Sequence, residues 1–325
     1  MSEKLLEIKD LHTFFYTDAG VVKAVNGVSF QVNKGQTIGI VGESGCGKSV
    51  MSLSIMRLIQ DPGKIVKGQV IFNGQDLVKL SQGEMRKING DRISMIFQEP
   101  MTSLNPVFTV GNQIAESLIL HENLTKKQAR EKAVEMISTV GIPRADGIYD
   151  SYPHELSGGM RQRIMIAMAL SCNPELLIAD EPTTALDVTI QAQILDLLKE
   201  IKRKFGTSIM LITHDLGVVA EMADYVIVMY AGRIIEQGKV DDIYLNPMHP
   251  YTIGLLKSKP SITTVSDRLY TIPGQVPNLI NLPEICYFSD RCKMCKDTCK
   301  QGFPELIDMG NDHFVACTLF GEVTK

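Results

Sequence analysis

Eight consecutive residues near the start of the chain have the types and spacing of a phosphate-binding loop. Residues 42–49 match the pattern G-x-x-x-x-G-K-[ST] without a gap. The glycines let such a loop curl tightly, so that successive N–H groups point at phosphate oxygens. Lys48 would supply a full positive charge for the β- and γ-phosphates, and the Ser49 hydroxyl could bind Mg²⁺. A glycine turn followed by a surface lysine is the alternative.

The segments on either side of this loop fit the first interpretation. Residues 36–41 form a short apolar run that predicts a buried strand, and residues 49–58 predict a helix. A strand, a glycine-rich loop and a helix in this order are the context that phosphate binding requires. The candidate nucleotide-binding residues of the loop are Gly42, Glu43, Ser44, Gly45, Cys46, Gly47, Lys48 and Ser49.

Two adjacent acids follow a second apolar run. Asp180 and Glu181 come directly after residues 176–179, which predict a buried strand. A carboxylate at the end of a strand beside the loop strand can hold Mg²⁺ directly or through water. Glu181 would then be placed to orient and deprotonate an attacking water molecule. A charged turn is the alternative.

Residues 156–162 open a strongly helical run and offer a second anion site. Ser157 is a natural helix N-cap, and Gly158 and Gly159 leave their N–H groups exposed. An ordinary capped helix is the alternative.

The remaining pattern predicts an α/β sheet with crossover connections. Strands are expected at 5–8, 28–32, 68–74, 209–212 and 225–229. Helices are expected at 190–205 and 216–222, and residues 100–160 should be mainly helical, with a long polar-faced segment at 125–140. After about residue 245, frequent prolines and five cysteines between 286 and 317 indicate a small appended domain.

Bulk composition excludes several classes of protein. The chain has 325 residues, of which 44% are hydrophobic and 22% are charged, and its net charge is −4. A negative balance disfavours a general nucleic-acid binder. No run is long and apolar enough to span a membrane, and the N-terminus lacks an apolar signal region, so a cytoplasmic location is expected. Cysteines in a reducing compartment suggest core, metal or reactive roles before disulfides.

Taken together, the motifs resemble those of the ATP-binding subunits of ABC transporters. Residues 42–49 look like the Walker A loop, 156–162 like the signature motif and 176–181 like Walker B. The other matching residues are Gln98 for the Q-loop, Asp187 for the D-loop, His214 for the switch histidine and Phe15 for the adenine-stacking aromatic. Tyr16 is a rival for the last position, and Met160 stands where many members have Gln.

This resemblance implies a P-loop ATPase fold with a mixed sheet and a helical subdomain at about 100–165. It implies an ATP-binding domain over 1–245 and an extension over 246–325. Lys48, Ser49, Gln98 and Asp180 would bind Mg-ATP, the last three as magnesium ligands. Ser157 and Gly158 would cap ATP on a second subunit. Gly159 and Asp187 are further expected nucleotide-binding residues. Glu181 would be the general base, and His214 would contact the γ-phosphate and the water.

The extension resembles the tail of oligopeptide, dipeptide and nickel importer ATPases. The resemblance implies a [4Fe–4S] cluster on Cys286, Cys292, Cys299 and Cys317. Cys295 is extra to that set, and its C-x-x-C spacing with Cys292 also suits zinc. Free or oxidised thiols are a further alternative.

The function implied is ATP hydrolysis that energises peptide import. The expected partners are two membrane permeases, a second ATPase and an extracytoplasmic binding protein. The second ATPase could be a copy of this chain, but a paralogue is expected. Residues 99–108 are expected to help receive a permease helix, or else to form a plain loop. The alternative cargo is nickel or another solute. A soluble ABC-type ATPase on nucleic acid or ribosomes, and a redox-sensing regulator, are the other hypotheses.

Overall fold

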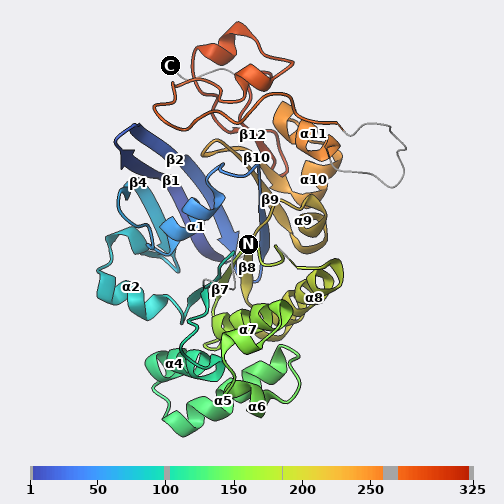
Figure 1. The fold of residues 1–325 in the computed structure, drawn as a ribbon. Helices are drawn as coiled ribbons and strands as arrows, with labels where there is room; N and C mark the ends of the chain where they lie inside the picture. The colour runs from blue at the N-terminus through green and yellow to red at the C-terminus, as the bar shows by residue number, and fades with distance from the viewer. Residues whose placement is uncertain (1–2, 99–102, 185, 259–269, 322–325) are drawn as a thin grey trace. The chain divides into compact units, whose positions relative to one another are not determined.

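A computed structural model of the protein describes residues 3–98, 103–184, 186–258 and 270–321. The chain forms two compact units. Figure 1 labels its helices and strands. The first unit consists of Met1–Leu5, Asn33–Gln36 and Lys79–Ile212. The second unit consists of Leu6–Val32, Thr37–Val78 and Thr213–Lys325. The expected domain boundary at residue 245 stays a prediction.

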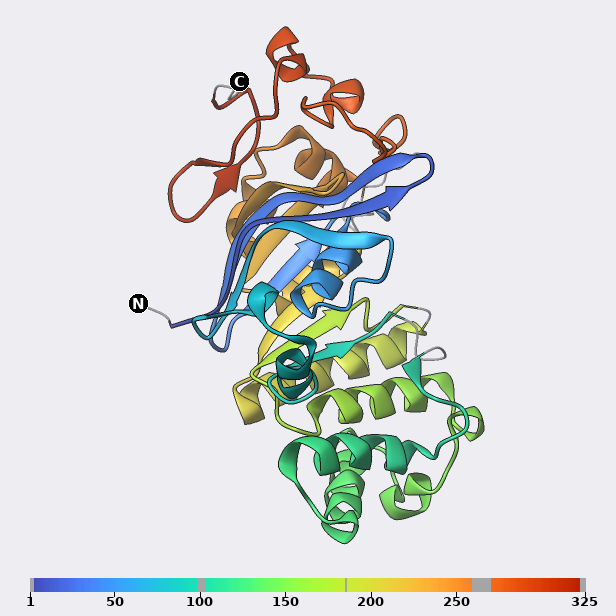
Figure 2. The same ribbon diagram turned by 90° about the vertical axis from the view of Figure 1, so that its left-hand side faces the viewer.

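The second unit contains an antiparallel sheet in the order β2-β1-β4-β5. Its strands are β1 (Lys4–Thr17), β2 (Gly20–Asn33), β4 (Gly63–Phe72) and β5 (Gln75–Asp76). The two long strands β1 and β2 run side by side as a curved ribbon (Figure 2). The sequence predicted only the parts of β1 and β2 at 5–8 and 28–32. The predicted strand at 68–74 covers the end of β4 but extends two residues past Phe72, into a turn.

A second group of strands in this unit has the order β11-β12-β10-β9-β3. These are β3 (Thr37–Val41), β9 (Tyr225–Tyr230), β10 (Arg233–Lys239), β11 (Ile307–Asp308) and β12 (Phe314–Val315). β3 and β9 are parallel, whereas β10 is antiparallel to β9 and to β12. The sheet is therefore mixed, as predicted. The segment after residue 245 contributes β11 and β12 to this sheet.

Helices cover the second unit and extend into its C-terminal segment. They are α1 (Lys48–Ile55), α9 (Leu216–Met222), α10 (Val240–Leu245) and α11 (Pro250–Lys257), with the short 3₁₀ helices η1 (Leu77–Lys79), η3 (Ser289–Arg291) and η4 (Asp297–Lys300). Tyr230, Tyr251 and Phe288 pack ring against ring, with centroids 4.7–5.5 Å apart. The C-terminal segment therefore shares one apolar core with β9.

The first unit has the parallel strands β8-β7-β6. Their bounds are β6 (Ile93–Ile96), β7 (Leu176–Asp180) and β8 (Ser208–Ile212). Every residue of β7 and β8 is buried, which explains why both read as unbroken apolar runs. α8 (Val188–Phe205) begins at the N-cap Asp187, and Gly206 follows it in a left-handed conformation.

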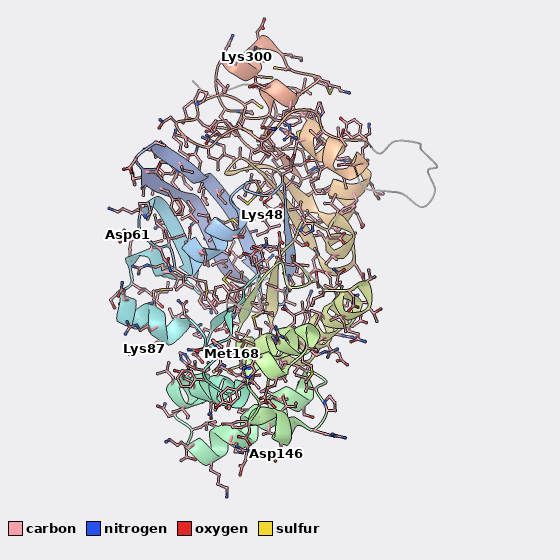
Figure 3. All side chains as sticks on the ribbon, viewed as in Figure 1. Lys48, Asp61, Lys87, Asp146, Met168 and Lys300 are labelled. Atoms are coloured by element: carbon pink, nitrogen blue, oxygen red, sulfur yellow. The ribbon has the colours of Figure 1, made fainter. Side chains whose placement is uncertain are left out.

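Helices make up most of the rest of the first unit. These are α2 (Gln82–Ile88), α4 (Val110–Glu122), α5 (Lys126–Thr139), α6 (Ala145–Tyr149) and α7 (Gly158–Leu170), with the 3₁₀ helix η2 (Pro153–Glu155). α5 begins where predicted, because the side chains of Thr125 and Gln128 form a capping box. Figure 3 shows Met168 on α7 and Asp146 on α6. Within the described ranges, no helix has the length and hydropathy needed to cross a bilayer.

Two helical glycines of the first unit offer a test of this packing. A Cβ atom at Gly111 in α4 would lie 2.2 Å from the ring of Tyr149, whereas one at Gly147 in α6 would meet nothing within 4 Å. We expect Gly111→Ala to lower the free energy of unfolding by about 1–2 kcal/mol, since overpacking outweighs the gain in helix propensity. The control Gly147→Ala should raise it by up to about 1 kcal/mol. Urea unfolding measures both, and equal stability of the two variants would contradict the packing described.

Candidate functional site

Residues 42–47 connect β3 to α1, and Lys48 and Ser49 begin that helix, as the motif requires. The glycines of this loop adopt positive φ angles, of 77° at Gly45 and 100° at Gly47. A Cβ atom at Gly47 would lie 2.1 Å from the carbonyl oxygen of Ala24, and one at Gly42 would lie 2.3 Å from that of Met229. Only glycine fits at these two positions, so the loop forms a cradle of bare backbone.

Lys48 is folded back onto the loop that carries it. Its Nζ donates hydrogen bonds to the carbonyl oxygens of Gly42 at 2.7 Å and Glu43 at 3.1 Å, and the residue is only 6% exposed. Carbonyl groups carry no net charge, so these hydrogen bonds do not neutralise the positive charge that would attract a polyanion. Ser49 lies in the first turn of α1, beside Lys48. These donors fit a bound triphosphate with its magnesium ion.

Cys46 is buried within the same loop, with no exposed surface. Its backbone carbonyl accepts a hydrogen bond from Gly232 N at 2.9 Å. Burial raises the pKa of its thiol, although the nearby Lys48 ammonium acts in the opposite direction. The thiol is therefore protonated at neutral pH.

The predicted acids of the first unit lie at the end of β7. Asp180 is the last residue of that strand and is 3% exposed. The carboxylate of Glu181 accepts hydrogen bonds from Gln98 Nε2 at 3.1 Å and Thr184 Oγ1 at 2.8 Å. Glu181 has a φ of 48°, and its N–H donates to Ile212 O at 2.8 Å. The structure thus brings Gln98 and Glu181 together, and Thr184 is a contact that the sequence did not indicate.

The segment 156–162 forms the start of α7. Ser157 is its N-cap, as predicted, and the Ser157 Oγ accepts a hydrogen bond from Met160 N at 3.3 Å. Ser157 and Gly158 are exposed. Gln162 is buried and donates to Pro182 O at 2.7 Å, which ties this helix to the turn after β7.

Three other predicted residues lie in exposed or half-buried positions. Asp187 is exposed, and its carboxylate accepts a hydrogen bond from Ile190 N at 2.9 Å. His214 is exposed in the connection that precedes α9. Phe15 lies on β1 opposite Gly63, and Tyr16 is 49% exposed. The rest of the expected D-loop includes Ala185, which lies outside the described residues, as do residues 99–102 of the expected docking segment.

The four predicted cluster ligands line one small cavity in the second unit. Cys286, Cys292, Cys299 and Cys317 border a space of about 10 Å³. Burial, together with the neighbouring thiols, raises the pKa of Cys286 to about 12. The soft sulfur donors suit iron or zinc, but the space is about that of one water molecule, too small for a four-iron cluster as the thiols stand. In the described part of the chain, no group of three or more His, Cys, Asp or Glu residues is placed to hold a metal.

Two further residues that contact the phosphate-binding loop had no sequence signal for that role. Tyr251 Oη accepts a hydrogen bond from Glu43 N at 2.9 Å, and Arg291 forms an ion pair with the Glu43 carboxylate. Both come from the segment after residue 245, and only the folded chain brings them to the loop.

Comparisons with known proteins agree with these motifs. The family profile described as "ABC transporter" matches residues 25–184, and that described as "Oligopeptide/dipeptide transporter, C-terminal region" matches residues 235–299. The chain is 54% identical to the oligopeptide transport ATP-binding protein AppD of Bacillus subtilis, over 98% of this chain and 97% of AppD. It is 52% identical to the dipeptide transport ATP-binding protein DppD of Bacillus subtilis, over 98% of this chain and 95% of DppD.

Solved structures show the same fold. A dimeric ATP-binding cassette in a post-hydrolysis state, bound to ADP and Pi, matches with a TM-score of 0.66 at 27% identity. The match covers 73% of this chain and 99% of the other. The predicted α/β P-loop ATPase fold is therefore confirmed.

The burial of Cys46 predicts slow alkylation. We expect iodoacetamide to modify Cys46 slowly in the native chain, because its side chain is inaccessible and its thiol pKa is raised. Since the thiolate is the reactive form, the rate should rise with pH, by up to about tenfold per pH unit between about pH 7 and 8. Peptide mass spectrometry measures the rate, with the partly buried Cys295 as the native control and urea-unfolded chain as the limit. Equal native rates for the two cysteines would contradict the burial.

Proposed function

The chain belongs to the ABC transporter family, among the oligopeptide and dipeptide transport ATP-binding proteins, and we propose that it is the ATP-hydrolysing subunit that energises peptide import. One observation carries the proposal: relatives that share half or more of their residues over nearly the whole chain are oligopeptide, dipeptide or peptide transport ATP-binding proteins. The match to an oligopeptide/dipeptide C-terminal region supports the same cargo.

In the proposed site, the loop of residues 42–49 binds the triphosphate. Its N–H groups and the Lys48 ammonium would hold the β- and γ-phosphates. Ser49, Gln98 and Asp180 are the proposed Mg²⁺ ligands, and the bound ion would neutralise negative charge on the β- and γ-phosphates. The cradle of glycine backbone at 42–49 supports this assignment. Phe15, with Tyr16 as its rival, is proposed to stack on the adenine.

Glu181 is proposed as the general base for the attacking water. Gln98 and Thr184 donate hydrogen bonds to its carboxylate, and these bonds orient the group that is proposed to accept the water proton. His214 is proposed to contact the γ-phosphate and the same water. His214 is exposed in the connection that precedes α9.

A second ATPase subunit is proposed to complete the site. Ser157 and Gly158 present exposed N–H and hydroxyl donors at the start of α7, and Gly159 continues that turn. Asp187 is exposed at the start of α8. Such groups can cap a nucleotide held by another chain, and hydrolysis then allows the two chains to part. We propose a paralogue as this partner.

The other proposed partners are two membrane permeases and an extracytoplasmic peptide-binding protein. The ATPase would then lie at the cytoplasmic face of the membrane. Val107 and Phe108 are 70% and 54% exposed, whereas Leu104 beside them is 2% exposed. This exposed apolar pair supports a docking role for the segment at 103–108.

The four thiols Cys286, Cys292, Cys299 and Cys317 are proposed to bind a [4Fe–4S] cluster. Their convergence on one cavity supports the proposal, although they would have to move apart to admit the cluster. Iron and sulfide analysis of anaerobically purified chain tests it. Zinc in place of iron, or neither metal, would refute the cluster.

Two substitutions test the nucleotide site. Glu181→Gln should keep ATP binding but lower kcat by about 10²–10⁴-fold, because an amide does not accept the water proton. Lys48→Ala should instead weaken ATP binding itself. Titration calorimetry and phosphate release measure the two effects, with the exposed Glu200→Gln of α8 as the control. Turnover by Glu181→Gln at the wild-type rate would remove Glu181 from the proposed role.

Transport in vesicles tests the cargo. The chain, assembled with its permeases and partner ATPase in proteoliposomes, should show ATP hydrolysis that rises when peptide-loaded binding protein is added. Ni²⁺ supplied in place of peptide is the matched control. If Ni²⁺ and not peptide stimulates ATP hydrolysis, the cargo is nickel and the peptide proposal fails.

A further inference from the structure

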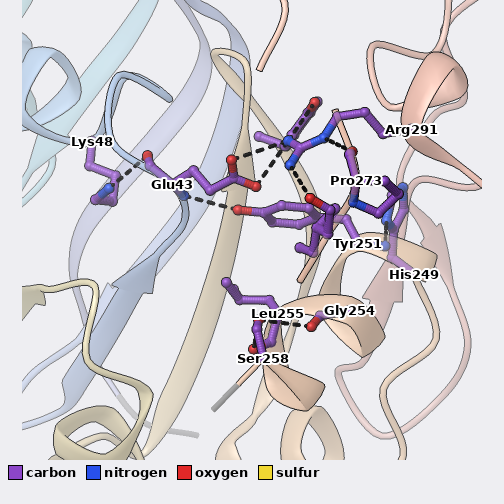
Figure 4. A network of polar contacts seen from close by, with 11 residues as sticks. Glu43, Lys48, His249, Tyr251, Gly254, Leu255, Ser258, Pro273 and Arg291 are labelled. Atoms are coloured by element: carbon purple, nitrogen blue, oxygen red, sulfur yellow. Dashed lines mark hydrogen bonds and ion pairs between the residues drawn. The ribbon is translucent and has the colours of Figure 1, made fainter. Parts of the chain in front are cut away.

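We propose that Arg291 is a positioning residue for the phosphate-binding loop. Through Arg291, the segment after residue 245 sets the affinity of this loop for ATP. Arg291 is the last residue of η3, and Cys292 follows it directly. Its Nη1 donates to both carboxylate oxygens of Glu43, at 3.0 and 3.1 Å (Figure 4). The inference rests on the proposed role of residues 42–49 in ATP binding.

The guanidinium of Arg291 is held rigidly by its surroundings. Its Nε donates to Pro273 O at 2.9 Å, and its Nη1 also donates to Tyr230 Oη at 3.2 Å. Only 6% of the side chain is exposed. With these bonds in place, the ion pair with Glu43 loses little side-chain entropy when it forms, unlike a pair between mobile surface residues.

The backbone of Glu43 is held from the same side. Its N–H donates to the hydroxyl of Tyr251 at 2.9 Å, and Tyr251 is fully buried at the start of α11 (Figure 4). The carbonyl of Glu43 accepts a hydrogen bond from Lys48 Nζ at 3.1 Å. The main chain and side chain of one loop residue therefore contact two residues from the segment after 245.

Charge explains why this contact should affect ATP. Glu43 is the second residue of a loop that binds a polyanion, and its carboxylate is 28% exposed. An unpaired carboxylate here would repel the phosphates and compete for the Lys48 ammonium. Arg291 forms an ion pair with this carboxylate and so neutralises its charge. Arg291 thus favours ATP without contacting it.

The test is a double-mutant cycle on the full-length chain. Arg291→Gln should raise the Kd for Mg-ATP, and the KM of the assembled transporter, about tenfold, within the range of coupling between sites. The kcat should stay unchanged. In the Glu43→Gln background, the same Arg291→Gln change should raise neither value, because no charge is left to pair. Arg291→Lys should restore part of the affinity.

A matched control comes from the same segment. Glu284 forms ion pairs with Lys23 and Arg233, which lie outside the loop of residues 42–49. Glu284→Gln should leave the Kd unchanged. An Arg291→Gln effect that persists in the Glu43→Gln background would overturn the proposal, because it would reflect general damage to the segment.

The outcome separates this inference from the proposed function. If Lys48→Ala abolishes ATP binding while Arg291→Gln binds ATP as the wild type does, only the inference fails. If Lys48→Ala leaves ATP binding intact, the proposed nucleotide site fails, and the inference fails with it.

Discussion

Steric crowding around Gly42 and Gly47 leaves no room for a side chain at either position. This constraint fixes the path of the phosphate-binding loop within the second unit. Gly47 passes against Ala24 of β2, and Gly42 passes against Met229 of β9. β9 is itself paired in parallel with β3, the strand that leads into the loop. The curve of the loop is therefore set by neighbouring strands, and Lys48 emerges at the start of α1 with its ammonium turned back over bare carbonyls. A side chain at either glycine would displace a strand.

A buried carboxylate explains how the C-terminal segment comes to rest near that loop. Glu236 of β10 has no exposed surface, and it accepts hydrogen bonds from the backbone N–H groups of Met248 and His249, at 2.7 and 2.9 Å. His313 Nε2 lies 2.8 Å from the same carboxylate. Burying such a group is costly unless its oxygens are bonded, so this arrangement favours one position of the segment.

Burial also keeps the His249 side chain neutral, which allows it to cap α11. Loss of solvent lowers the pKa of His249 to about 3, so the imidazole is neutral at physiological pH. Its Nδ1 can then accept a hydrogen bond from Tyr251 N at 3.0 Å, which caps α11. Tyr251 in turn reaches Glu43. A line of contacts thus runs from β10 to the phosphate-binding loop within one unit.

Local signals determined the glycine loop, the Ser157 and Thr125 caps and the apolar strands β7 and β8, because each depends on residues only a few positions apart. The sequence also determined the family, since its motifs are short and ordered. Tertiary structure alone decided the contact of Arg291 with Glu43, 248 positions away, and the addition of β11 and β12 to the sheet. The sequence around each of these residues contains no local signal for the contact that it makes. The physical reason is that charge pairing and strand pairing act through space, whereas propensity and capping act along the chain.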